Sequence, residues 1–121
     1  SIDRTFPNGT EVEIFSFNAL EIAWKFAQKK SEREHVTPYF YNNPKKFKIH
    51  YFKQQKDQSK FRYSIDRNED YLVVLEILSR IKTRPIKTSD IVELLRNDPK
   101  IMKLNSHIIP NEGYRKSINE D

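Results

Sequence analysis

Cysteine is absent from this sequence of 121 residues, so no disulfide bond, thiolate chemistry or cysteine-based metal site is available. Glycine occurs only twice, as Gly9 and Gly113, which excludes a glycine-rich phosphate-binding loop. No apolar run approaches the roughly 18–20 residues that a membrane-spanning helix needs, and no signal peptide is recognisable. We therefore expect a cytoplasmic protein without a membrane anchor.

The length and composition suit one folded domain, or one lobe of a larger domain. Aromatic residues make up 12% of the chain, so a core can form despite the 32% of charged residues. The net charge of +5 suits an anionic ligand and equally a solvated surface. We expect residues 1–121 to form a single lobe. The start at Ser1 inside a charged phrase is what a truncated product would show, although processing would look the same.

Three short segments rich in strand formers alternate with helical patterns. We expect strands at residues 12–15, 47–52 and 61–65, the first of them preceded by the turn residues Pro7-Asn8-Gly9. The expected order is β-α-α-β-β-α-α, an α/β or α+β lobe. The tail from Asn105 to Asp121 has weak periodicity and no expected strand.

Capping residues mark the first two expected helices. Ser16 is expected to cap an amphipathic helix that ends at Lys29-Lys30. Ser31-Glu32-Arg33-Glu34 has the spacing of a capping box and predicts the start of a second helix. Pro38 should kink or restart this helix before it stops near Asn42.

A third capping pattern coincides with a candidate metal ligand. Asp66 and Glu69 follow the last expected strand and precede a helix with a wide apolar face. Open α/β sheets gather ligands where their strands end, so the Asp66 carboxylate is a candidate for Mg²⁺. The alternative is that Asp66 is only an N-cap, because Asp is a preferred capping residue. Thr88 is expected to cap a last short helix, which Asp98-Pro99 ends.

Other charged residues form two candidate binding sets. Glu11 and Glu13 would share one face of the first expected strand and can bind sugar hydroxyls or a metal, although on pattern alone the solubility of an edge strand explains them better. Arg33, Glu34 and His35 lie at an expected helix start, where Arg33 can clamp a carboxylate or phosphate. Charged residues are also ordinary in a first helical turn. The three histidines lack metal-ligand spacing, so we expect no zinc site.

A basic segment with interspersed aromatic residues offers an alternative function. Lysines between Lys45 and Lys56 surround Phe47, Tyr51 and Phe52, and such a segment can bind single-stranded nucleic acid by charge and stacking. A strand with a buried aromatic face and solvated lysines explains the same pattern, and no nucleic-acid-binding motif accompanies it. A module that binds polyanions or nucleic acid is therefore kept only as the alternative.

Four blocks, in this order, resemble the bacterial spore-coat-polysaccharide-type cytidylyltransferases: Phe6–Phe15, Arg33–Tyr39, Arg62–Asp70 and Asn111–Tyr114. That family is related to the enzymes that make CMP-Kdo and CMP-sialic acid. Its members are about twice as long as this chain, which resembles their C-terminal half. The chain departs from the family pattern at Asn8 and Glu11, where Asp is usual, and at Arg67-Asn68, where Thr-Pro is usual.

The resemblance implies the C-terminal lobe of a nucleotide-diphospho-sugar transferase-like, Rossmann-like three-layer fold. It implies that the anomeric hydroxyl of a sugar or sugar acid attacks the α-phosphate of CTP and that pyrophosphate departs, for surface-polysaccharide synthesis. Asp66 would bind Mg²⁺, and substrate would be bound by Glu11, Glu13, Arg33, Glu34, His35 and Arg62. Because the other half would carry the triphosphate loop, we expect the chain to be inactive alone. Half of a domain would leave apolar surface and sheet edges uncovered. A homodimer or an oligomerisation lobe is therefore a further alternative.

Overall fold

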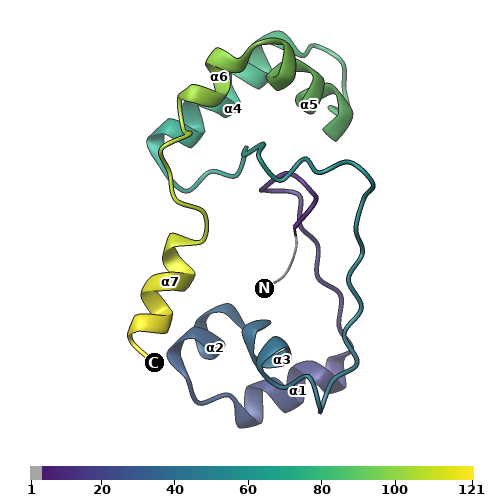
Figure 1. Ribbon diagram of the computed structural model, residues 1–121, viewed down its shortest axis with the longest axis vertical. Coiled ribbons are helices and arrows are strands. Elements are labelled where there is room, and N and C mark those ends of the chain that lie inside the picture. Colours follow the sequence, from purple (N-terminus) through teal and green to yellow (C-terminus); the bar gives the residue numbers. More distant parts are fainter. Residues whose placement is uncertain (1–3) are drawn as a thin grey trace. The chain divides into compact units, whose positions relative to one another are not determined.

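The computed structural model describes residues 4–121, which form seven helices in two compact units (Figure 1). Unit 1 contains residues 4–12 and Lys53–Ile108, and unit 2 contains Glu13–Phe52 and Ile109–Asp121. Each unit is therefore assembled from two segments that are distant in the sequence. The expectation of a single lobe stays a prediction. None of the helices in the described part of the chain is long and apolar enough to cross a membrane.

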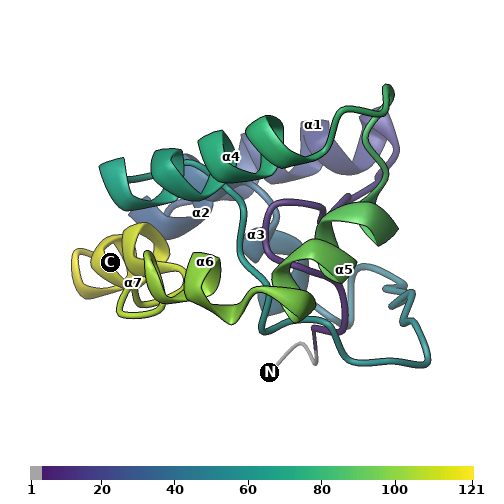
Figure 2. The ribbon, with the colours of Figure 1, turned by 90° about the horizontal axis from the view of Figure 1, so that it is seen from above.

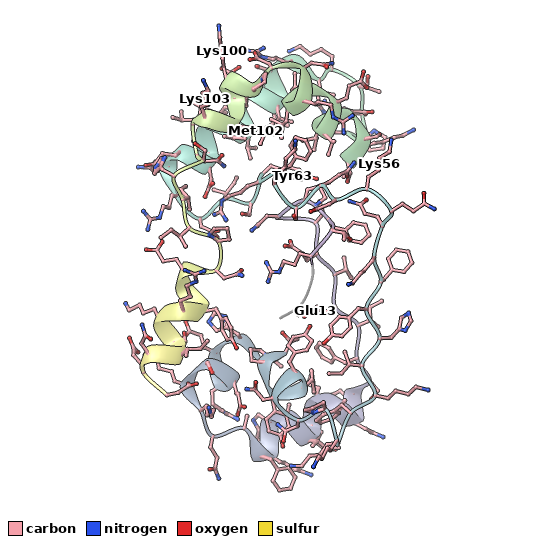
Figure 3. All side chains as sticks on the ribbon, viewed as in Figure 1. Glu13, Lys56, Tyr63, Lys100, Met102 and Lys103 are labelled. Carbon is pink, nitrogen blue, oxygen red and sulfur yellow. The ribbon has the colours of Figure 1, made fainter. Side chains whose placement is uncertain are left out.

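Unit 1 is built on three helices, α4 (Asn68–Arg80), α5 (Thr88–Asn97) and α6 (Pro99–Lys103), which lie together in Figure 1. Tyr63 and Met102, labelled in Figure 3, pack against the edge of its core. The buried core side chains come from all three helices and from the segment before α4, and they are Phe61, Val73, Ile77, Val92, Leu95 and Ile101. The helices expected after Asp66 and near Thr88 are both present, but Thr88 is the first residue of α5 and not its cap, which is Lys87.

The turn at residues 7–10 is fixed against the segment that precedes α4. The Asn8 N–H donates to the Phe61 carbonyl at 2.8 Å, and the Tyr63 N–H donates to the Asn8 carbonyl at 3.1 Å. Gly9 has φ of +106°, and a Cβ atom there would lie 2.8 Å from the Ser64 nitrogen. Both the positive φ and the close approach require glycine, so the turn predicted from Pro7-Asn8-Gly9 is anchored in unit 1.

Unit 2 is built on α1 (Phe17–Phe26), α2 (Lys30–His35), α3 (Pro38–Asn42) and α7 (Glu112–Asn119). Its buried core is small and largely aromatic. Tyr39 and Phe40 of α3 are 4% and 7% exposed, and Ala23 of α1 is 2% exposed. Phe47 packs edge-on against both aromatic rings, with centroid distances of 5.9 Å to Tyr39 and 4.9 Å to Phe40. Edge-to-face packing of this kind stabilises small cores beyond the area that it buries.

The helix boundaries in unit 2 follow the sequence signals closely, with two corrections. The Ser16 hydroxyl accepts the Ala19 N–H at 3.2 Å, as expected of an N-cap, but α1 ends at Phe26 rather than at Lys29-Lys30. The restart expected near Pro38 is confirmed: Val36 has a positive φ of 63° and separates α2 from α3. Ser31 does not cap α2, because it lies inside the first turn of that helix.

Helix α7 lies beside α2, as Figures 1 and 2 both show. The contact is a polar seam. The Ser31 N–H and hydroxyl each donate to the Asp121 carboxylate, at 2.7 Å, and Lys30 pairs with Glu120. No element was expected in this part of the sequence, so α7 is an addition to the predicted order.

The expected α/β fold is wrong. Among residues 4–121 there is no sheet, and the only strand-like pairing is an isolated bridge between Asn8 and Arg62. The segments 12–15 and 47–52 form neither strand nor helix. A strand exists only through hydrogen bonds to a neighbouring strand, whereas strand-forming composition reports only the suitability of the side chains. The described residues supply no neighbouring strand, so the Rossmann-like three-layer order β-α-α-β-β-α-α does not form.

Candidate functional site

The strongest polar cluster of unit 1 surrounds Asp70, in the first turn of α4. Its carboxylate is fully buried and accepts two bonds from the Arg62 guanidinium, from Nε to Oδ1 and from Nη2 to Oδ2, both at 2.9 Å. Asn105 Nδ2 donates to Oδ1 at 2.8 Å. The backbone N–H groups of Asp66 and Arg67 donate to Oδ2 at 3.1 and 3.2 Å. Each oxygen therefore accepts at least two hydrogen bonds, which compensates for the burial of its charge.

The hydrogen bonds around Asp70 shift two pKa values. The Arg62 guanidinium holds the pKa of Asp70 well below its ordinary value, although burial of the carboxyl opposes this shift. Asp70 in turn raises the pKa of Arg62. Both groups are therefore charged at neutral pH.

The structure corrects the expected cap of α4. Asp66 is not the N-cap, because the cap is Arg67 and the acid at the third helical position is Asp70, not Glu69. The side chain of Asp66 is 68% exposed, and its Oδ2 accepts from Arg62 Nη2 at 2.6 Å. The Ser64 hydroxyl lies 3.5 Å from the same oxygen. Asp66 therefore does not cap α4, and its carboxylate is exposed to solvent beside Arg62.

Glu11 also belongs to unit 1. Its carboxylate accepts the Gly9 N–H at 2.8 Å and lies 3.4 Å from Arg4 Nη1. Glu13 belongs to unit 2, where the Tyr41 hydroxyl donates to its carboxylate. Because the segment forms no strand, the argument that placed Glu11 and Glu13 on one face fails. Their roles in binding stay predictions.

The residues around Asp66 suit only a sparse Mg²⁺ site. No group of three or more potential metal-ligating side chains occurs within the described range of 4–121. Mg²⁺ is commonly held by one or two carboxylates and completes its shell with water and substrate phosphates, so one exposed carboxylate fits this type of site. The Arg62 guanidinium beside that carboxylate opposes the approach of a cation. Asp66 is therefore suited to a cation that arrives with an anionic substrate.

In unit 2, Arg33, Glu34 and His35 are the last three residues of α2, so the expectation that they lie at a helix start, where backbone N–H groups favour anions, is wrong. Helix α7 contacts Glu34 and His35. The buried Ser117 hydroxyl donates to the Glu34 carboxylate and lies 3.2 Å from His35 Nε2. The His35 ring packs edge-on against Tyr114 at a centroid distance of 5.4 Å. Arg33 Nη1 donates to the Trp24 carbonyl at 2.7 Å. The structure thus brings this predicted set together and fixes two of its members through α7.

A hollow of about 430 Å³ opens at the α2–α7 contact. Arg33 and Glu34 line it together with residues of both helices, namely Lys30, Gly113, Lys116, Ser117 and Glu120. A smaller hollow of about 330 Å³ in unit 1 is lined by Lys56 and residues of α5, and no predicted site residue lies there. The α2–α7 hollow is therefore the one associated with the predicted residues.

Four residues of these clusters were missed by sequence reasoning. Asp70 left no recognisable capping signature, because the N-cap side chain of a capping box must accept a hydrogen bond and the side chain of Arg67 has no acceptor. No local sequence pattern marks the other three residues, which are Asn105, Ser117 and Glu32. Each of them joins its cluster through hydrogen bonds with residues that are distant in the sequence or that belong to another helix. Glu32, for example, is 7% exposed and accepts from Asn42 Nδ2 at 2.9 Å.

Comparison with known proteins gives a solved structure and a protein of similar sequence, whereas no family model matches. The solved structure is a cytidylyltransferase from Leptospira borgpetersenii serovar Hardjo-bovis, with a TM-score of 0.79 and 33% sequence identity over 88% of this chain. The protein is the uncharacterized MJ1063 of Methanocaldococcus jannaschii, which is 36% identical over 110 residues, or 89% of this chain. The chain spans 44% and 45% of their lengths, less than half of each.

Proposed function

We propose that this chain is part of a cytidylyltransferase that transfers CMP from CTP to a sugar or sugar acid. The observation that carries the proposal is the likeness in both backbone and sequence to the cytidylyltransferase from Leptospira, with a TM-score of 0.79 and 33% identity. The ordered sequence blocks that resemble spore-coat-polysaccharide-type enzymes support the finer assignment to surface-polysaccharide synthesis, which we place in the cytoplasm.

Each unit would contribute substrate contacts of its own. Arg33, Glu34 and His35 line or flank the α2–α7 hollow and would bind the sugar, because carboxylate and imidazole groups pair with hydroxyls and a guanidinium pairs with carboxylate or phosphate. Arg62 would contact the nucleotide phosphates. Glu11 and Glu13 would add acceptors for substrate hydroxyls, each in its own unit.

Asp66 would hold Mg²⁺ through its exposed carboxylate. When bound, the ion would neutralise charge on the phosphates of CTP. The chain's own contribution is to present Asp66 and Arg62 side by side, at 2.6 Å, so that one negative and one positive group face the same ligand. An anionic phosphate can satisfy both the guanidinium and the ion, which offsets their mutual repulsion.

We further propose that the chain does not catalyse the reaction alone. It spans less than half of both similar proteins, and its only glycines are Gly9 and Gly113, so a phosphate-binding loop must come from elsewhere. The alternative of a basic nucleic-acid-binding module is less well supported, since Phe47 of the basic segment packs into the core of unit 2. Association into a homodimer stays a prediction.

A chimera tests the proposal. This chain replaces the matched 44% of the Leptospira cytidylyltransferase, and release of pyrophosphate from CTP is measured with Mg²⁺ and a panel of sugars and sugar acids. The expected result is sugar-dependent release by the chimera and none by the chain alone. A chimera with the circular dichroism of a folded protein that releases no pyrophosphate with any acceptor would refute the proposal.

A further inference from the structure

Asp70 determines the conformation of the segment that carries Asp66. Two of its five hydrogen bonds come from the backbone N–H groups of Asp66 and Arg67, at 3.1 and 3.2 Å. These bonds hold the chain where it enters α4. Since a fully buried carboxylate needs such donors, the backbone at Asp66 and the side chain of Asp70 fix each other.

Asp70 also fixes the direction of the Arg62 side chain. Nε and Nη2 lie on one edge of the guanidinium, and each donates to a different oxygen of Asp70 at 2.9 Å. A planar fork bound at two points cannot rotate without breaking both bonds. Nη2 then reaches Asp66 Oδ2 at 2.6 Å, so the exposed carboxylate is held by an arginine that is itself immobilised.

Asn105, which follows α6, completes the arrangement. Its side chain is 4% exposed, and Nδ2 donates both to Asp70 Oδ1 at 2.8 Å and to the Arg62 carbonyl at 3.3 Å. Asn105 therefore holds the acid and the backbone of the arginine at once. Neither Asn105 nor Asp70 is exposed enough to meet a ligand.

We propose that Asp70 and Asn105 are positioning residues, which act through Arg62 to set the orientation of the exposed Asp66 carboxylate. This inference rests on the proposed function in one respect, namely that Asp66 binds a cation. In metal sites, an outer-shell group is one that hydrogen-bonds to a ligating side chain and orients it. Removal of the outer-shell group typically lowers metal affinity about 10–100-fold.

NMR spectroscopy on the isotope-labelled chain tests the inference. The Arg62 Nε–Hε signal reports whether the guanidinium is hydrogen-bonded to Asp70, because a hydrogen-bonded proton exchanges slowly with water. Asp70→Asn and Asn105→Ala are each expected to raise that exchange rate at least tenfold. Mn²⁺ is added in parallel as its complex with pyrophosphate, because Asp66 is suited to a cation that arrives with an anion. Paramagnetic broadening at the Asp66 amide measures cation binding, which should weaken about tenfold in both variants.

The control is Asp90→Asn. Asp90 occupies the third position of α5 and accepts the Lys87 N–H at 3.3 Å, so it has the local capping role of Asp70 without an arginine. This variant should leave both the Arg62 signal and Mn²⁺ binding unchanged. A general loss of helix stability would instead affect all three variants alike.

The outcomes separate the inference from the proposed function. An Arg62 signal that exchanges equally slowly in the folded variants and the parent chain overturns the positioning role. Should Asp70→Asn not fold, Asn105→Ala decides the matter, because it keeps the Arg62–Asp70 pair and removes one donor. Absence of Mn²⁺ broadening at Asp66 in the parent chain would contradict the cation role proposed for Asp66, while the Arg62 signal would still decide the positioning role.

Discussion

The two units hold their predicted site residues by different means. In unit 1, the exposed Asp66 depends on the fully buried Asp70, whose charge is compensated by Arg62 at 2.9 Å. In unit 2, Glu34 and His35 depend on the neutral hydroxyl of Ser117, and both side chains stay substantially exposed, at 53% and 33%. A buried charge that loses its partners costs far more than a hydroxyl that loses one bond, so the site of unit 1 should be rigid and sensitive to mutation, and that of unit 2 adaptable.

The largest effect is expected from Asp70→Ala. Removal of this carboxylate takes from Arg62 both bonds of its fork and from Asn105 one acceptor, in a buried setting, which should lower the free energy of unfolding by about 3–5 kcal/mol. Urea unfolding followed by circular dichroism measures the loss. Asp90→Ala, which removes the equivalent capping acid of α5, should cost about 1 kcal/mol or less. Equal losses in the two variants would mean that Asp70 only caps its helix.

Acid should weaken unit 1 through the same residue. Arg62 lowers the pKa of Asp70 in the folded protein. Such a carboxyl contributes its full stabilisation above the ordinary pKa of Asp, about 4. The stabilisation is lost as the pH falls from there toward the lowered pKa of the folded state. Urea unfolding between pH 7 and pH 3 should therefore show a decline below about pH 4 that is smaller in Asp70→Asn. Parallel curves for the two proteins would contradict this assignment.

A smaller effect is expected from Ser117→Ala in unit 2. The change removes one hydrogen-bonded hydroxyl that is 3% exposed and should cost about 1 kcal/mol. The signals of His35 and Tyr114 should shift, while those of Arg62 and Asp70 should not. Ser79→Ala is a matched control, because the Ser79 hydroxyl bonds only within α4, to the Glu76 carbonyl at 2.9 Å. Shifts of the Arg62 signals in Ser117→Ala would contradict independent support of the two sites.

The smallest effect is expected from Arg80→Ala. Like Arg62, Arg80 bridges two carboxylates, those of Glu76 and Asp98, each at 2.8 Å, but its side chain is 46% exposed. Exposed pairs of this kind contribute little because water screens them. Urea unfolding should show no change outside experimental error. A loss that approaches that of Asp70→Ala would show that burial does not account for the sensitivity of the Arg62 network.

The sequence predicted the larger helices better than any other feature. The Ser16 cap, the restart at Pro38 and the helix from Thr88 were each marked by local chemistry, and each is present. Helix α6 was hidden because Asp98-Pro99 was interpreted as a stop, whereas Asp98 accepts the Lys100 N–H and caps a new helix. Helix α7 buries only Ser117 and is held by polar contacts with α2, so no apolar periodicity could reveal it.

The strands and the site depended on contacts that local patterns do not contain. Strand-forming composition at 12–15 and 47–52 was not matched by a partner strand among the described residues, so the predicted sheet is absent. The capping pattern at Asp66 was shifted by one residue, because Asp70 rather than Glu69 is the buried acid. Arg33, Glu34 and His35 were grouped by an expected helix start, which the structure does not place there, and by the family resemblance. The contacts of Glu34 and His35 with α7 could be seen only in the folded chain.

Asp66 in the cytidylyltransferase chimera provides the most direct test. Pyrophosphate release from CTP is compared between the chimera and its Asp66→Asn and Asp90→Asn variants at saturating Mg²⁺. The account predicts that Asp66→Asn lowers kcat by about 100-fold or more, as expected for a group that supports charge neutralisation in the transition state, and that Asp90→Asn has little effect. Full activity in a folded Asp66→Asn chimera would contradict the role of this carboxylate.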